Sequence, residues 1–228
     1  MSARPKGAPI SKFVLPISTV SGFAEAVQAD IQDAAYAAAL SYADAIRGLI
    51  AGNPSWALIK LYYSAFYNIR LLLLLDGIIP FHCGEYYLCD SRDGAVKRGG
   101  KSSHQWQWNS LRDFRRSGWY YSVDSSDAYD RLKAIREDAN YRFGFIDPNW
   151  HRCLAQVSVA GIPKSFRTYR DDGDFTYTYL DDHVSFAYPT KILYAASSIF
   201  LAAGHGVSEE RQSHLKKTWP LKDKPPLF

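Results

Sequence analysis

The chain has 228 residues, of which 47% are hydrophobic and 15% aromatic, a length that suits one elaborated domain and a composition that excludes intrinsic disorder. Its three cysteines are too few, and odd in number, for a disulfide framework, and no apolar stretch follows the N-terminal cations as in a signal peptide. We therefore expect a cytoplasmic protein, whose net charge of +4 arises from one basic segment, residues 92–116.

Two long helices are predicted first. Apolar residues recur at three- and four-residue steps from Val20 to Ala51, which is the period of an amphipathic helix. The next segment, Ser55–Leu75, is apolar around most of its circumference, as in a helix at the centre of a bundle. Its Lys60 and Arg70 would be costly inside a bilayer, so we expect a buried helix and no membrane association. The short connection at residues 52–54 makes the two helices antiparallel neighbours.

The middle of the chain is predicted to contain a long loop followed by three helices. Glycine and proline interrupt residues 77–102 repeatedly, which predicts a long loop with one short strand at residues 85–89. Apolar spacing predicts helices over residues 103–116, 126–143 and 148–159.

In the last third of the chain, the sequence predicts a β-hairpin followed by another helix. Residues 175–180 and 183–187 alternate between apolar and polar side chains, with Asp181-Asp182 between them, which predicts a β-hairpin. A final helix is expected over residues 189–203.

The predicted fold class is therefore mainly α: an antiparallel helical bundle with a C-terminal β-hairpin and an additional helix. We expect an extended N-terminal arm over residues 1–19, the bundle with its long loop over residues 20–160, and the hairpin and helix packed on it over residues 161–210. The proline-containing tail, residues 211–228, is expected to be extended.

Two of the helical segments carry sequence patterns found together in one known family. Residues 58–72 contain Tyr62-Tyr63-x-x-Phe66-x-x-x-Arg70 within an apolar helix that ends in a leucine run, and residues 132–141 contain Arg136 followed by small and aromatic side chains. The two segments resemble the second and the last core helices of the HEPN superfamily, the higher eukaryotes and prokaryotes nucleotide-binding domain. Residues 104–114 are similar to its third helix, and the resemblance covers about residues 20–145.

The resemblance implies a bundle of four or five helices, often a homodimer, of a kind common in prokaryotic defence and toxin–antitoxin systems. Active members are metal-independent endoribonucleases with an Arg-x4–6-His motif on the last core helix. Counted from Arg136, the positions of that histidine hold Tyr141, Arg142 and Phe143, and the next histidine is His151. The departure favours a non-catalytic or weakly catalytic protein.

Arg136 is the first candidate site residue. Asn140 follows it by one helical turn, so the two side chains are expected on one side of the helix, where a guanidinium and an amide suit a phosphate. The alternative is a structural arginine paired with Glu137, Asp138 or Asp76. His104 is the candidate for a displaced general base beside Arg136; the alternative is a surface histidine at a helix N-terminus.

The basic segment is the second candidate. Its cations are interleaved with tryptophans, and cations can follow phosphates while aromatic rings stack on unpaired bases. The alternative is a solvated charged face with tryptophans packed in the core. The candidate nucleic-acid-binding residues, besides Asn140, are Arg92, Lys97, Arg98, Lys101, Trp106, Arg112, Arg115 and Arg116.

No metal or cofactor is expected. Cys83 and Cys89 lack the close spacing of a zinc site, and His151 and Cys153, with one residue between them, are spaced too tightly, so buried thiols and a surface histidine are expected instead. The acidic residues 171–174 do not have the spacing of a calcium loop and suit a turn.

Three functional hypotheses remain open. The first is a HEPN-like defence component that binds RNA or DNA, or docks as a subunit on a larger ATPase or nuclease. The second is an endoribonuclease that uses Arg136 with a displaced base, and the third is a sensor of a nucleotide or other small ligand.

Overall fold

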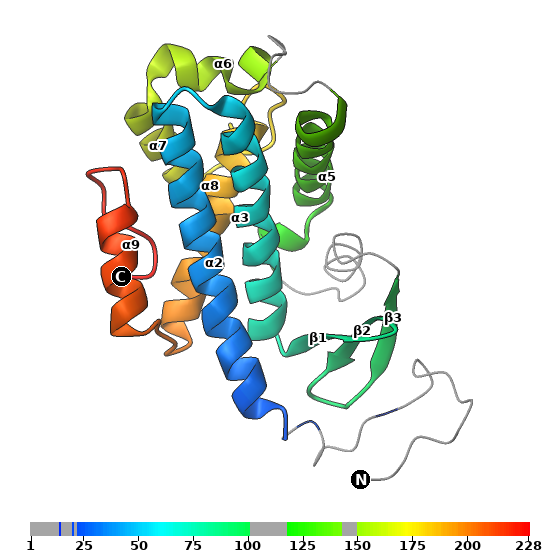
Figure 1. Ribbon diagram of the computed structural model, residues 1–228. Helices are drawn as coiled ribbons and strands as arrows, with labels where there is room; N and C mark the ends of the chain where they lie inside the picture. Colours follow the sequence, from blue (N-terminus) through cyan, green and yellow to red (C-terminus); the bar gives the residue numbers. More distant parts are fainter. Residues whose placement is uncertain (1–13, 15–19, 21, 101–117, 143–149) are drawn as a thin grey trace.

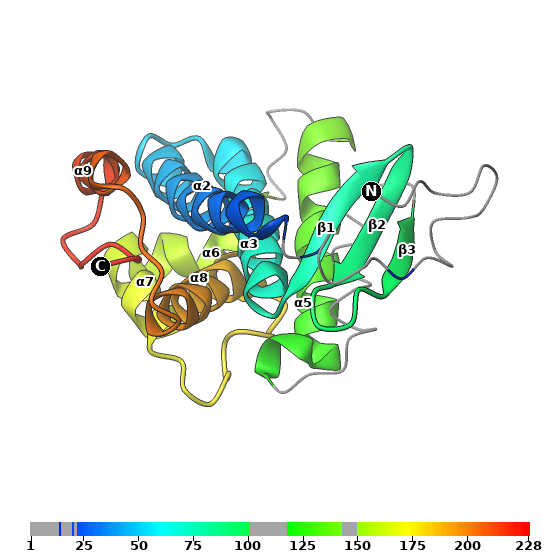
Figure 2. The ribbon, with the colours of Figure 1, turned by 90° about the horizontal axis from the view of Figure 1, so that it is seen from below.

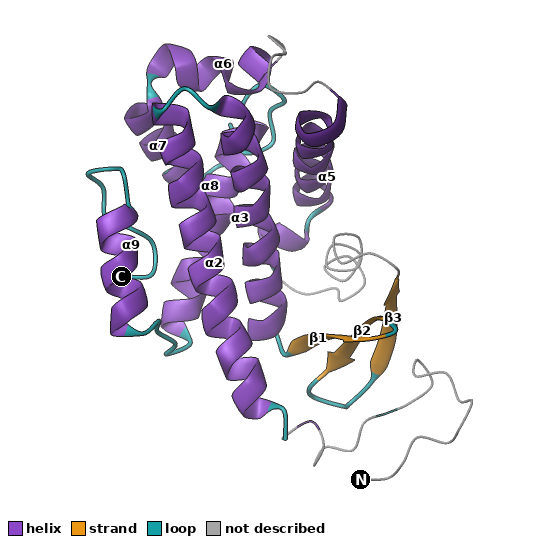
Figure 3. Ribbon diagram, in the orientation of Figure 1, coloured by secondary structure: helices purple, strands orange, loops and turns teal. Residues whose placement is uncertain are grey.

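The computed structural model describes residues 14, 20, 22–100, 118–142 and 150–228. Helices form a bundle, and a small sheet lies beside it (Figures 1 and 3). The helices are α2 (Ala24–Ile50), α3 (Pro54–Leu75), α5 (Val123–Glu137), α6 (Trp150–Ala160), α7 (Ile162–Arg170), α8 (Val184–Ala202) and α9 (Glu209–Thr218). The strands are β1 (Ile78–Cys83), β2 (Glu85–Asp90) and β3 (Val96–Gly100); η2 (Trp119–Tyr121) is a 3-10 turn and η3 (Asp138–Arg142) a π-helical turn. The prediction of a mainly helical protein is confirmed.

α2 and α3 are antiparallel neighbours, as the short connection between them predicts (Figure 1). α2 can approach other helices closely because much of its buried surface consists of methyl groups. Its buried alanines are Ala34, Ala35, Ala38, Ala39, Ala43 and Ala45. Two ion pairs join the helices: Asp44 lies 3.1 Å from Lys60 and Asp30 lies 2.7 Å from Arg70.

One hydrophobic core runs through the bundle. α8 packs against both α2 and α3, and the hydroxyls of Tyr42 on α2 and Thr190 on α8 lie 2.5 Å apart within it. By length and composition α3 could cross a membrane, as many core helices could, but 72% of its most apolar stretch is buried inside the bundle. Seen along the bundle, α9 flanks α2 on one side and the sheet lies on the other side, beyond α3 (Figure 2).

The strand predicted at residues 85–89 is confirmed as β2. The loop predicted around it is wrong, because most of residues 77–102 form a three-stranded antiparallel sheet in the order β1-β2-β3. Gly84 joins β1 to β2 with a φ of 73°, a conformation that glycine adopts without strain. The glycines and Pro80, which made the segment look like a loop, lie at turns and edges instead. Apolar residues on one face of the sheet form a small second cluster with Val20.

Pro80 lies in the middle of the edge strand β1. The amide of Ser91 donates to the carbonyl of Gly77, so the alternate residues Ile78, Pro80 and His82 direct their backbone groups away from β2. Pro80 therefore removes no hydrogen bond from the sheet, which is why a proline is tolerated there.

The predicted β-hairpin over residues 175–187 is also wrong. The buried carboxylate of Asp172 accepts hydrogen bonds from the amides of Thr176, Tyr177 and Thr178, at 2.8–2.9 Å, and from the hydroxyl of Thr178 at 2.7 Å. These contacts coil the segment into turns, so its backbone donors are no longer available for a strand ladder. α8 then begins at Val184, five residues before the predicted start, with Pro189 in its second turn.

The tail over residues 211–228 is not wholly extended, because α9 occupies its first part. Ser208 caps α9 by accepting a hydrogen bond from the amide of Arg211. Trp219, just beyond the helix, is buried with its ring centre 6.0 Å from that of Tyr42 and 6.1 Å from that of Phe166. The C-terminal segment is thus part of the core.

The remaining predicted helices differ in how far the structure describes them. α5 begins at Val123, three residues before the prediction, because the side chain of Ser122 caps it by accepting from the amide of Ser125. α6 agrees with its prediction to within two residues. The predicted helix over residues 103–116 lies outside the described residues, and so does the N-terminal arm apart from Val14.

Candidate functional site

Arg136 lies in the last turn of α5 and extends onto α3. Its Nη2 donates to the hydroxyl of Tyr63 at 3.4 Å, and its Cζ lies 5.3 Å from the ring centre of Tyr62 and 5.8 Å from that of Tyr63. The two helices that carry the HEPN-like patterns therefore lie side by side, as expected. Arginine stacks well on aromatic rings because the guanidinium is planar and weakly hydrated.

The predicted structural alternative for Arg136 was an ion pair with a neighbouring carboxylate. Among the residues that the structure describes, no carboxylate lies within ion-pair distance of it. Asp76 accepts a hydrogen bond from Tyr121, and Glu137 lies 4.0 Å from Lys133. The contacts of Arg136 are aromatic instead.

The phenols around Arg136 carry no compensating charge at neutral pH. Burial raises the pKa of Tyr62 to about 12, and burial likewise raises the pKa of Tyr129, whose hydroxyl lies 3.1 Å from that of Tyr62. Burial lowers the pKa of Arg136, but its hydrogen bond to Tyr63 and the nearby phenols raise it, and the net shift is upward. Arg136 is therefore a permanent cation in a neutral, aromatic surrounding.

The guanidinium of Arg136 also has an unused donor. Its Nε is buried and has no hydrogen-bond partner in the described structure. A buried donor without a partner costs roughly 1–3 kcal/mol. A partly buried cation with a spare donor, and with no carboxylate within ion-pair distance among the described residues, is suited to an anion supplied from outside the chain.

The described residues show no contact between Asn140 and Arg136. The α-helix ends at Glu137 and continues as the π-helical turn η3, in which the residue five positions after Arg136 lies closer to its side of the helix than it would in an α-helix. Asn140 is exposed, whereas Tyr141 is close enough to Arg136 to affect its pKa. Tyr141 is also 77% exposed, so its aromatic ring is available in solvent at the end of the helix that carries Arg136.

Neither Tyr63 nor Tyr141 was predicted as a site residue from the sequence. Tyr63 stood in the family pattern, and its position on the helix facing Arg136 was the available signal. Nothing in the sequence marks the change from α- to π-helical spacing in the segment that holds Tyr141.

The basic segment is only partly described. Arg92 forms two hydrogen bonds to the buried carboxylate of Asp90, at 2.9 and 2.5 Å, so its charge is already compensated. Lys97 is exposed on β3, and Arg98 lies in the same strand. The other predicted residues lie outside the described part of the chain: His104, Lys101, Trp106, Arg112, Arg115 and Arg116.

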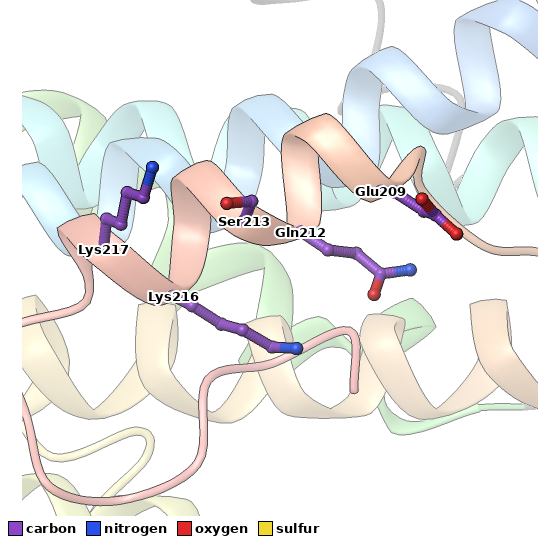
Figure 4. Close-up of a pocket in the computed structure, with 5 residues that line it drawn as sticks. All are labelled: Glu209, Gln212, Ser213, Lys216 and Lys217. Atoms are coloured by element: carbon purple, nitrogen blue, oxygen red, sulfur yellow. The ribbon is translucent and has the colours of Figure 1, made fainter.

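Other parts of the described chain offer little chemistry. They contain no group of three His, Cys, Asp or Glu side chains that could hold a metal ion. A polar hollow lies along α9, with Glu209 near the start of the helix and Lys216 and Lys217 near its end (Figure 4). This order of charges complements the helix dipole, and the side chains in Figure 4 do not converge on one point.

Arg136 with its tyrosines is therefore the best-formed candidate site. The comparisons with known proteins add no assignment: no protein-family model, no curated protein and no solved structure matches the chain.

Proposed function

We propose that this chain is a HEPN-like component of a prokaryotic defence or toxin–antitoxin system that binds RNA through Arg136 without cleaving it efficiently. The observation that carries the proposal is the guanidinium of Arg136, which stacks on Tyr62 and Tyr63 and has no carboxylate partner among the described residues. A phosphate would supply the missing negative charge and accept from the donors of Arg136. An unpaired base next to that phosphate would stack on the exposed ring of Tyr141, five residues after Arg136.

The proposed lack of efficient cleavage rests on the family motif, whose histidine position holds Tyr141 here. Metal-independent cleavage of RNA needs a general base within hydrogen-bond reach of the 2′-hydroxyl. Tyr141 occupies the first position where the family motif would have histidine, and no histidine in the described residues contacts Arg136. His183, for example, is engaged with the hydroxyl of Tyr169 at 2.8 Å.

Fluorescence anisotropy with a short labelled single-stranded RNA tests the proposal. We expect Arg136→Ala to weaken binding about tenfold or more and Arg136→Lys to restore it partly, because lysine keeps the charge but not the planar stacking. The matched control is Arg131→Ala, which removes another arginine of α5, one that pairs with Asp181 instead. Binding should also weaken steeply as salt is raised.

Two results would reject the proposal. Equal loss of affinity in the Arg136 and Arg131 variants would mean that only overall charge matters. No RNA binding by the wild type at low salt would reject the function itself. Cleavage of total RNA by the wild type, lost in Arg136→Ala, would instead support the endoribonuclease hypothesis.

A further inference from the structure

One end of the bundle carries an apolar hollow of about 260 Å³. It lies where the connection between α2 and α3 meets α6 and α7, at the end where α6 crosses the bundle (Figure 1). Its lining is mostly aliphatic and comes from three parts of the chain: Leu49, Pro54, Leu154, Val157 and Ile162. Water in such a hollow has few polar partners, so its release on binding an apolar group is favourable.

Large apolar side chains stand exposed beside this hollow. Ile50 is 60% exposed, Trp56 50% and Val159 86%. Ile50 and Val159 are the chain neighbours of residues that line the hollow, and Trp56 lines a second hollow that shares Pro54 with the first. A single exposed apolar residue needs no explanation, but several around an apolar hollow mark an interaction surface.

The charges at this end are mostly positive. The segments that form it, residues 44–60 and 153–164, contain Arg47, Lys60 and Lys164 but a single acid, Asp44, which gives a net charge of +2. Asp44 is shared between Arg47 and Lys60, and Lys60 also lies 5.1 Å from the ring centre of Trp56. Cations thus border the apolar side chains directly.

We propose that this end of the bundle binds an acidic, amphipathic segment of a partner protein. A bulky apolar side chain of the partner would fill the hollow, and its carboxylates would face Arg47, Lys60 and Lys164. A second copy of this chain fits poorly, because a two-fold interface would place these cations opposite one another. A hollow with aliphatic walls is filled by an inserted side chain better than by a lipid surface, which favours a protein over a membrane.

The proposal does not depend on the RNA-binding function. The surface shares no residue with the Arg136 site. Peptide binding should survive Arg136→Ala, and RNA binding should survive Trp56→Ser, so failure of one proposal can be distinguished from failure of the other.

Selection of a phage-displayed random peptide library on the full chain tests the proposal. We expect the enriched peptides to combine bulky apolar residues with net negative charge. Their affinity should fall about tenfold or more for Trp56→Ser and for Val159→Ser, both exposed positions that tolerate polar side chains. Leu201→Ser is the matched control, since Leu201 is 39% exposed on α8 and lies outside both hollows.

A charge reversal makes the test specific. Selection on the double variant Lys60→Glu, Lys164→Glu should enrich basic instead of acidic peptides. The proposal is overturned if no peptide is enriched, if the wild type enriches peptides without acidic residues, or if Leu201→Ser weakens binding as much as Trp56→Ser. Sedimentation with phosphatidylserine vesicles that depends on Trp56 would overturn it in favour of a lipid surface.

Discussion

The hydroxyl oxygen of Tyr62 on α3 lies 3.1 Å from that of Tyr129 on α5, and both side chains are fully buried. We expect Tyr129→Phe and Tyr62→Phe each to lower the free energy of unfolding by about 1 kcal/mol, the usual net worth of one hydrogen bond. The double variant should cost clearly less than the sum of the two, because the second substitution removes a hydrogen bond that is already lost. Urea unfolding of the three variants measures this coupling, and strict additivity would contradict it.

Buried tyrosines predict a loss of stability at alkaline pH. Burial raises the pKa of Tyr62 and that of Tyr169 to about 12, above the value of about 10 that a tyrosine has in the unfolded chain. Between these values the unfolded chain releases protons that the folded chain retains, so the free energy of unfolding falls as pH rises. The contribution is fully present below about pH 10 and is lost by about pH 12.

Urea unfolding at a series of pH values checks this window, with phenolate absorbance as a second signal. Tyr62→Phe should make the fall between about pH 10 and pH 12 shallower, since one raised pKa is removed. A free energy of unfolding that stays constant across that window would show that the phenols ionise without unfolding the chain.

Asp172 is expected to be the most important single residue of the turns between α7 and α8. Asp172→Asn replaces one accepting oxygen with a donor and should cost about 2–3 kcal/mol, as hydrogen bonds to a buried charge are lost. Limited proteolysis should then cut within residues 171–183. Asp174→Asn is the control, because Asp174 is exposed in the same segment, and equal effects of the two substitutions would disprove the role of Asp172.

Trp219 predicts that the C-terminal segment is needed for stability. Trp219→Ala should cost about 3–5 kcal/mol, because it leaves a cavity beside Tyr42 and Phe166. The matched substitution Trp56→Ala removes a half-exposed tryptophan and should cost much less. Thermal unfolding of the two variants compares them directly, and a chain that ends at Thr218 should be destabilised like Trp219→Ala.

The bounds of a helix could be predicted where residues that start and stop helices flank an apolar run that is buried in the fold. The bounds of α3 follow from Pro54 at its start and Asp76-Gly77 after its end, with an apolar run between them. Of the sheet, the sequence predicted the strand at residues 85–89 and missed the other two, because glycines and Pro80 are typical of loops but lie here at turns and in the edge strands. The false hairpin has the alternation of a strand, but the contacts of Asp172 decide its conformation, and no pattern in the sequence shows them.

The candidate site was predictable to a similar degree. The likeness to a family placed Arg136 beside the tyrosine-rich helix, and the structure brings them into contact. That its neighbours are neutral phenols, and not carboxylates, depends on the rotation of α5 about its axis and on the wide turn after it. Neither can be read from residue spacing alone.

Pro80 has a consequence for how copies of this protein can meet. A chain that tried to lengthen the sheet along β1 would find no amide hydrogen at the middle of the strand, so the growing ladder would be interrupted there. Extension by strand addition, the first step toward fibres, is thereby discouraged on that side.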